Sequence, residues 1–218
     1  RPIQHLTWQR TITDQAFNIA RKLSSQAAFT SAYQVVNNYS NPGPTTLREW
    51  LLLCTFPNTG DNGLNIDFID ADPSKTITET ALRPRASEFT NGVSWKRYPV
   101  PVSSDYVNLE DATACGPLDN RITYAFGYVY SPVAVSGQLR LGSNDGIKAY
   151  VNGTEKLNIH LHRAAARDQN IVPIDLVAGI NTILLKIEDV TGAWGFYARL
   201  TKTDGSPLFD TITSSDSG

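Results

Sequence analysis

The sequence has few charges and no long apolar run, and these absences exclude several classes of protein. Charged residues make up 18% of the 218 residues, and the formal net charge is −2. The chain therefore has neither the basic footprint of a nucleic-acid-binding protein nor a polybasic membrane surface. No apolar stretch approaches the roughly 18 residues of a membrane-spanning helix. We expect no nucleic-acid partner and no membrane span.

Catalytic motifs are also missing from the sequence. It contains no GxSxG elbow, no HExxH motif, no phosphate-binding glycine loop and no dinucleotide fingerprint. Glu88, Glu110 and Glu188 could meet in space as a glycosidase carboxylate pair, but nothing in the sequence marks out two of them. The sequence therefore favours a protein that is not an enzyme and requires no cofactor, although it could belong to or assist a polysaccharide-degrading enzyme.

The chain has no methionine and only two cysteines. Cys54 and Cys115 could form a disulfide if their segments are neighbours, or could remain two separate thiols. Low charge, no methionine and many Thr, Asn, Ser and Tyr residues are typical of an exported protein. The chain begins at Arg1 without a charged-then-apolar leader, so we expect a mature form or an excised module.

The most informative stretch is GSNDGIKAYVNG (residues 142–153), which predicts an acidic loop, a strand and a hairpin turn. Apolar residues of IKAYV (147–151) alternate with Lys148 and Tyr150, as in a strand with one buried face. Asn152 and Gly153 favour the positive φ angles of a type I′ turn. A β-hairpin is therefore expected here.

Three further strands are predicted at residues 172–176, 181–189 and 194–200 (VPIDL, NTILLKIED and WGFYARL). The side chains expected to face the core are Ile147, Ala149, Val151, Val172, Ile174, Leu176, Trp194 and Phe196. Those expected to be relatively exposed are Lys148, Tyr150, Tyr197 and Arg199.

A further strand is predicted at YAFGYVYS (residues 124–131). Its four aromatic residues, Tyr124, Phe126, Tyr128 and Tyr130, share one face of the strand. This face could line a carbohydrate cleft or belong to the core, and the core is favoured for Phe126.

This order of elements, together with WLLLCTFPN (50–58) and HRAAARDQ (162–169), resembles a β-sandwich module of secreted, multi-modular bacterial proteins. The pattern is similar to the sugar-binding jelly-roll domains of β-galactosidase-type enzymes and to the protective-antigen lectin-like domain. The resemblance is densest over residues 124–200, weaker over 49–109, and stops before about Thr46. It implies an all-β, jelly-roll-like antiparallel sandwich that is secreted or displayed on a bacterial cell surface.

The expected domain organisation has three parts. Residues 1–45 should form an N-terminal helical extension and linker, because apolar residues recur at helical spacing over 12–29 and NPGP follows at 41–44. Residues 46–210 should form the sandwich, and residues 211–218 a flexible tail.

The resemblance also suggests a structural calcium ion. It places Asn144 and Asp145 where paired acidic residues of some lectins hold Ca²⁺, although Asn for the first acid removes one negative charge. The alternative is that Asp145 accepts backbone N–H bonds and fixes the loop. Asp61, Asp67, Asp70 and Asp72 also invite a calcium interpretation, but they fit no EF-hand spacing, and solvated surface acids are favoured.

His160 and His162 would point to one face of a strand and could present two imidazoles to a metal. A third ligand, such as Asp145 or Asp168, would have to come from elsewhere. The resemblance favours a different arrangement, in which an Arg163–Asp168 pair clamps the loop across the sandwich edge.

The leading function is a non-catalytic carbohydrate-binding accessory module that tethers a polysaccharide-acting protein to its glycan. The alternatives are a structural or adhesion module that packs against neighbouring domains, or a glycan hydrolase or lyase. Exposed aromatic rings would stack on sugar rings, with charged groups beside them. The ligand-binding candidates are Trp95, Tyr98, Tyr150, Tyr197 and Arg199. Trp95 and Tyr98 lie in a loop-rich segment and could equally be loop residues that pack under the sandwich as a satellite core.

Overall fold

The computed structural model describes residues 46–70, 77–101, 103–131 and 133–208. The helix predicted at 12–29 and the tail at 211–218 lie outside these residues, so the domain boundaries stay a prediction. None of the helices in the described part of the chain is long and apolar enough to cross a membrane.

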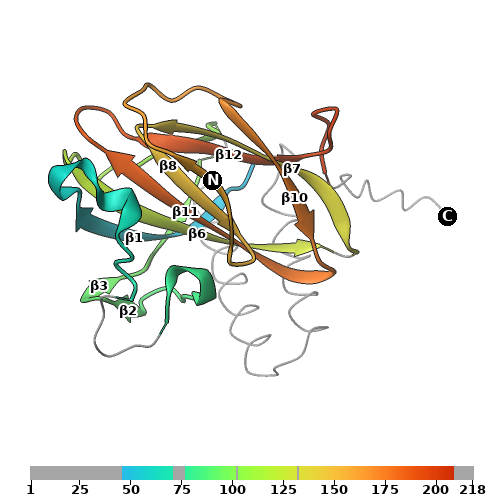
Figure 1. Cartoon of the computed structure of the whole chain (residues 1–218), viewed down its shortest axis with the longest axis horizontal. Coiled ribbons are helices and arrows are strands. Elements are labelled where there is room, and N and C mark those ends of the chain that lie inside the picture. Colours follow the sequence, from blue (N-terminus) through green and yellow to red (C-terminus); the bar gives the residue numbers. More distant parts are fainter. Residues whose placement is uncertain (1–45, 71–76, 102, 132, 209–218) are drawn as a thin grey trace, which may run out of the picture.

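Two antiparallel β-sheets pack as a sandwich, as the sequence predicted (Figure 1). The six-stranded sheet has the order β4 (Lys96–Pro99), β1 (Glu49–Pro57), β6 (Arg121–Ser131), β11 (Gly179–Asp189), β8 (Ile147–Val151), β9 (Thr154–Ile159). The four-stranded sheet has the order β10 (Asn170–Leu176), β7 (Val135–Asn144), β12 (Gly195–Thr201), β5 (Tyr106–Asn108). The finer jelly-roll assignment stays a prediction.

Alternating apolar residues fill the core between the two sheets. All eight side chains predicted to face this core are buried, from Ile147 at 0% to Val172 at 8% exposure. Trp50 of β1 meets Phe196 of β12 edge to face, with ring centroids 5.1 Å apart. The predicted hairpin turn is also confirmed, because Asn152 and Gly153 have φ angles of 50° and 78°. Local periodicity therefore gave the register of these strands correctly.

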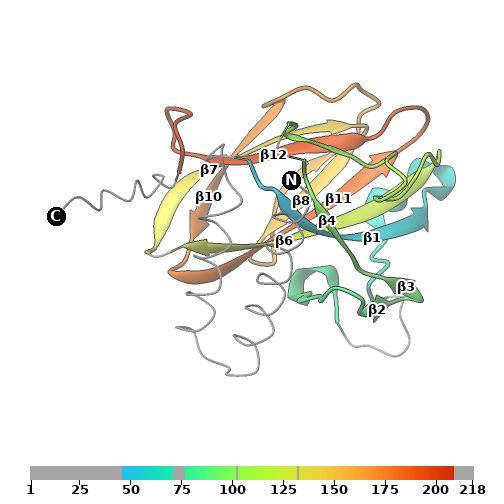
Figure 2. The ribbon, with the colours of Figure 1, turned by 180° about the vertical axis from the view of Figure 1, so that it is seen from behind.

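A second core covers the other face of the six-stranded sheet. It is built by the connection between β1 and β4, which contains η1 (Thr59–Asp61), η2 (Gly63–Asn65), η3 (Glu79–Ala81), β2 (Phe89–Thr90) and β3 (Val93–Ser94). Figures 1 and 2 show the β2–β3 hairpin on the side of this sheet away from β7 and β12. The buried residues of the second core are Leu53, Phe56, Leu64, Phe68, Ile69, Leu82, Trp95, Ile122, Tyr124, Phe126, Tyr150 and Leu184. The aromatic face of YAFGYVYS is therefore core at Tyr124 and Phe126.

A buried ion pair lies inside the second core. Lys186 of β11 is fully buried, and its Nζ donates to Glu79 Oε1 at 2.9 Å. The same amine donates to the carbonyl oxygens of Leu64 and Ile66. Tyr124 and Tyr150 donate their hydroxyls to the two oxygens of Glu79, at 2.5 and 2.9 Å. The connection and the sheet are thus joined by one polar network.

Burial sets the charge states that this network favours. Desolvation raises the pKa values of Tyr124 and Tyr150, and the negative charge of Glu79 raises them further, so both hydroxyls remain donors. Desolvation lowers the pKa of Lys186, and the Glu79 carboxylate opposes that change. Each buried charge therefore depends on its partner.

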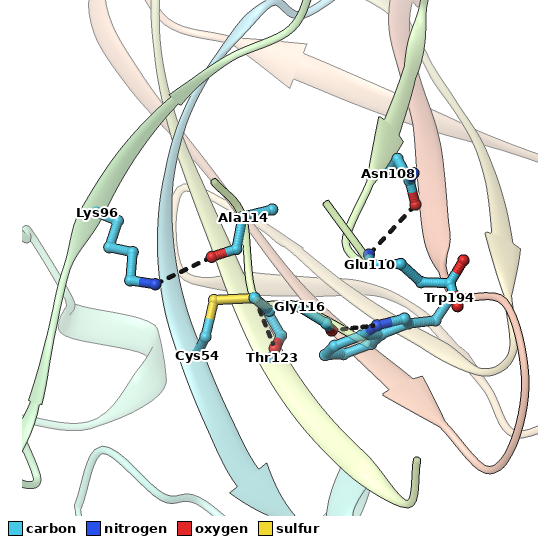
Figure 3. Close-up of a disulfide and its surroundings, with 9 residues drawn as sticks. Cys54, Lys96, Asn108, Glu110, Ala114, Gly116, Thr123 and Trp194 are labelled. Carbon is cyan, nitrogen blue, oxygen red and sulfur yellow. Dashed lines mark hydrogen bonds between the residues drawn. A yellow bond between two sulfur atoms is a disulfide. The ribbon is translucent and has the colours of Figure 1, made fainter. Parts of the chain in front are cut away.

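Cys54 and Cys115 form a disulfide, with Cα atoms 5.4 Å apart. The bond joins β1 to the segment between β5 and β6 (Figure 3). Lys96 Nζ donates to the carbonyl of Ala114 at 3.0 Å, and Trp194 Nε1 donates to that of Gly116 at 3.4 Å. This segment is therefore held at both sides of Cys115.

We predict that Glu79→Ala lowers the free energy of unfolding by about 3–5 kcal/mol, because it leaves the Lys186 charge buried without its partner. The double variant Glu79→Gln, Lys186→Met should lose clearly less, since it leaves no unpaired charge and keeps an acceptor for a tyrosine hydroxyl. Urea denaturation measures both. A Glu79→Ala protein within about 1 kcal/mol of the wild type would show that the ion pair does not hold the second core in place.

Candidate functional site

Three of the ligand-binding candidates are buried. The prediction that Tyr150 is exposed was wrong, and Trp95 and Tyr98 occupy the core position that the sequence left open for them. Trp95 is 1% exposed and Tyr150 is 6% exposed, both in the second core. Tyr98 is 4% exposed and packs in the core between the sheets. For Tyr150, the rule that alternate residues of a strand face solvent fails because both faces of the six-stranded sheet are covered. A sugar cannot stack on these rings in this conformation.

Tyr197 and Arg199 do lie near the surface, on the outer face of the four-stranded sheet, and both are half-buried. Tyr197 of β12 pairs directly with Tyr106 of β5, and their ring centroids are 4.9 Å apart at an interplanar angle of 47°. Tyr106 is also half-buried, and its burial, followed by the proximity of Tyr197, raises its pKa to about 12. Tyr106 was not among the residues predicted from the sequence, because the three residues of β5 show too little periodicity to assign a face.

The loop of residues 160–169 brings charged side chains to these tyrosines. It connects β9 of one sheet to β10 of the other and passes over Gly142 of β7. Gly142 pairs with Tyr197, and a Cβ atom at Gly142 would collide with the carbonyl of Ala166. The missing side chain at position 142 therefore lets the loop lie close to the sheet.

Two arginine–aspartate pairs lie beside the tyrosines. The guanidinium of Arg167 lies 5.8 Å from the Tyr197 ring centroid and makes two contacts with Asp105, at 2.6 and 2.7 Å. Arg199 contacts both oxygens of Asp168, with Nε to Oδ1 at 2.8 Å. We call Tyr106, Tyr197 and these two ion pairs the tyrosine platform.

The predicted Arg163–Asp168 pair was wrong. Asp168 instead binds Arg199 and Arg140, whose Nη1 lies 3.3 Å from Asp168 Oδ2. Arg163 donates to the side chains of Ser143 and Asn170 at 2.8 and 2.7 Å. Asp168 does hold the end of the loop, but it fixes the loop to the sheet and not to Arg163.

The Asn144–Asp145 loop shows the structural role that the sequence left open for Asp145. Its Oδ1 accepts the backbone N–H of Arg163 and its Oδ2 that of Val190, both at 2.9 Å. Each carboxylate oxygen keeps a further lone pair, so the residue types present are chemically able to bind a hard cation. No third His, Cys, Asp or Glu converges with Asp145 into a ligand group in the described part of the chain. Calcium at Asn144 and Asp145 stays a prediction.

Asp189, at the end of β11, is a buried carboxylate close to Asp145. It is 0% exposed, and neither oxygen accepts a hydrogen bond of normal geometry from the described residues. Burial and then the negative charge of Asp145 raise the pKa of Asp189 to about 7. A proton or a cation therefore favours the folded state here.

We predict that Asp189 makes the protein less stable as the pH rises from 5 to 8. The folded-state pKa lies above the ordinary value of 3.8, so the folded state binds the proton more tightly than the unfolded chain. This contribution to stability is complete below about pH 4 and is lost as the pH rises through about 7. Melting curves of Asp189→Asn should show a smaller decrease between pH 5 and 8 than the wild type. The exposed Asp70→Asn control should decrease as the wild type does.

If calcium binds at the Asn144–Asp145 loop, adding Ca²⁺ should raise the melting temperature in proportion to occupancy, and a chelator should reverse the rise. Asp145→Ala should abolish this response. If the Asp145→Ala variant responds to Ca²⁺ as the wild type does, Asp145 is not a calcium ligand, and its role is limited to the two backbone hydrogen bonds that fix the loop.

No protein-family model matches the chain, and no curated protein is similar to it in sequence. Solved structures share parts of its fold. An anti-sigma factor domain-containing protein is similar over 57% of this chain and 45% of its own, with 13% identity and a TM-score of 0.40. A PA14 sugar-binding domain from an RTX adhesin is similar over 45% of this chain and 58% of its own, with 20% identity and a TM-score of 0.37.

A β-glucosidase from Kluyveromyces marxianus, solved in complex with glucose, is similar over 79% of this chain but only 20% of its own. The identity is 13% and the TM-score is 0.43. The chain thus has distant structural similarity to sugar-binding domains, to glycosidase domains and to an anti-sigma factor domain-containing protein. Similarities this distant do not assign the chain to a family or give it a function.

Proposed function

We propose that the chain is a non-catalytic carbohydrate-binding module and that the tyrosine platform is its glycan-binding surface. The observation that carries the proposal is the pair of half-buried rings, Tyr106 and Tyr197, with two arginine–aspartate ion pairs beside them. The proposal keeps Tyr197 and Arg199 from the sequence analysis and adds Tyr106, Arg167 and the two aspartates.

The chemistry of the platform suits a sugar ring. A pyranose has apolar C–H faces, which stack on aromatic rings, and equatorial hydroxyls, which need donors and acceptors at the rim. Arg167 and Asp105 offer both kinds of group next to the Tyr197 ring. Because each charged side chain is already held by its partner, little conformational entropy is lost when a ligand binds.

The setting that we propose is secreted or on a bacterial cell surface. The Cys54–Cys115 disulfide suits an oxidising compartment, where such bonds persist. A module of this kind would hold an attached or partner enzyme close to its polysaccharide and raise the effective concentration there.

One observation favours the alternative, a module that packs against neighbouring domains. Val133 and Val177 are 60% and 55% exposed. They lie in the β6–β7 and β10–β11 turns, which are at the same end of the sandwich because Ser131 pairs with Gly179. An apolar end of this kind would suit a domain contact.

We predict that Tyr197→Ala weakens retention on the bound polysaccharide by about tenfold or more, because a stacking ring contributes on the order of 1.4 kcal/mol. The melting temperature should change little, since the ring is on the outer face of the sheet. The measurement is affinity electrophoresis in gels that contain soluble polysaccharides, after a glycan-array screen has selected them.

Phe89→Ala is the matched control. Phe89 is 63% exposed but lies in the separate two-stranded β2–β3 sheet, which is on the side of the six-stranded sheet away from β7 and β12, so its loss should leave retention unchanged. If Tyr197→Ala and Phe89→Ala lose retention equally, the tyrosine platform is not the glycan-binding surface. If no glycan in the screen is retained at millimolar concentration, the packing alternative replaces the carbohydrate one.

A further inference from the structure

Three potential metal ligands from distant parts of the sequence converge at one edge of the sandwich. Asp61 lies at the end of η1, and His160 and His162 lie at the start of the loop that follows β9. Asp61 Oδ2 is 3.3 Å from His160 Nε2 and 2.9 Å from His162 Nε2. Each residue offers one ligand atom, and the three atoms all lie within 4.8 Å of one another. This is the only such group of His, Cys, Asp or Glu in the described ranges.

A buried carboxylate determines which nitrogen of His160 faces this cluster. His160 Nδ1 lies 2.8 Å from Glu188 Oε2, and Glu188 is 0% exposed. Because a carboxylate accepts, we assign the proton to Nδ1, which leaves the lone pair of Nε2 directed at Asp61 Oδ2. Two acceptors that face each other at 3.3 Å need a cation between or beside them, either a second proton on the imidazole or a metal ion.

We propose that Asp61, His160 and His162 bind a divalent transition-metal ion of the Zn²⁺ type. Ligand atoms about 2.0–2.1 Å from a tetrahedral Zn²⁺ lie about 3.3–3.4 Å from one another. The His160–Asp61 separation of 3.3 Å already fits this edge, and a small shift of the His162 ring opens the 2.9 Å separation to the same value. Two imidazoles and one carboxylate suit zinc and its neighbours, and they do not suit Ca²⁺ or Mg²⁺, which prefer oxygen ligands.

The residues around the cluster hold its ligands in place, as the outer partners of metal-bound histidines do. Asn58 is fully buried, and its Nδ2 donates to Asp61 Oδ1 at 3.2 Å and to Glu188 Oε1 at 3.1 Å. A Cβ atom at Gly146 would collide with Glu188 Oε2, so the glycine leaves the carboxylate room to reach His160. One amide and one buried carboxylate therefore orient two of the three ligands.

The site is open to solvent on its outer side. The side chains of His160, His162 and Asp61 are 49%, 54% and 38% exposed. Three protein ligands leave at least one position for water or for a donor from another molecule, as in zinc sites that are not closed by a fourth side chain. The ion would also tie η1, and with it the second core, to the loop of the tyrosine platform.

The test is isothermal titration of the chelator-treated, desalted full chain with ZnCl₂, supported by melting curves. We expect one Zn²⁺ to bind per chain, without competition from Ca²⁺ or Mg²⁺. The melting temperature should rise when Zn²⁺ is added and fall back to its initial value when a chelator removes the ion. His160→Ala and His162→Ala should each weaken binding by more than about 100-fold, which exceeds the usual effect of an outer partner. Both side chains are about half exposed, so the variants should fold.

His5→Ala is the matched control, because His5 is the one histidine of the sequence outside the cluster and is distant from it in sequence. It should bind Zn²⁺ as the wild type does. If an alanine variant fails to fold, His162→Gln repeats the test. The proposal is overturned if the wild type binds no Zn²⁺ at submillimolar concentration, if both cluster variants bind as tightly as the wild type, or if only His5→Ala loses the ion.

Discussion

The ion pair between Lys186 and Glu79 is the interaction on which the arrangement of the second core depends. Lys186 lies on β11 at the centre of the six-stranded sheet, where both faces are covered, so its charge has no route to solvent. The amine can be buried only if the connection between β1 and β4 returns over the sheet and supplies Glu79 and two carbonyl oxygens. A long connection thereby becomes one wall of a second core. Its position in turn brings Asn58 and Asp61 to the edge of the sandwich, next to Glu188 and the histidines.

The parts of the fold that the sequence predicted correctly depend on neighbours in the chain. The alternation in IKAYV places Ile147, Ala149 and Val151 in the core, and Asn152-Gly153 makes the turn, because both signals operate over a few residues. The disulfide was left open by the sequence, since its formation depends on whether two segments 61 residues apart become neighbours.

The errors arose where a distant segment decides the environment. Tyr150 has the outward position of a strand with one buried face, yet Glu79 and the second core cover it. Asp168 has an arginine five residues before it, but the fold offers it Arg199 and Arg140 from two strands. The histidine pair was recognised in the sequence, whereas its third ligand was expected at Asp145 or Asp168. Asp61 is 101 residues from His162, and only the return of the chain over the sheet brings them together.

The loop of residues 160–169 carries groups that face two different surfaces. His160 and His162 at its start contact Asp61, and Arg167 and Asp168 at its end contact Asp105 and Arg199. Anything that orders one end of so short a loop reduces the conformational freedom that remains to be lost at the other. Two ligands bound at its opposite ends would therefore be thermodynamically linked, and the linkage would be reciprocal: each would change the affinity of the other by the same factor.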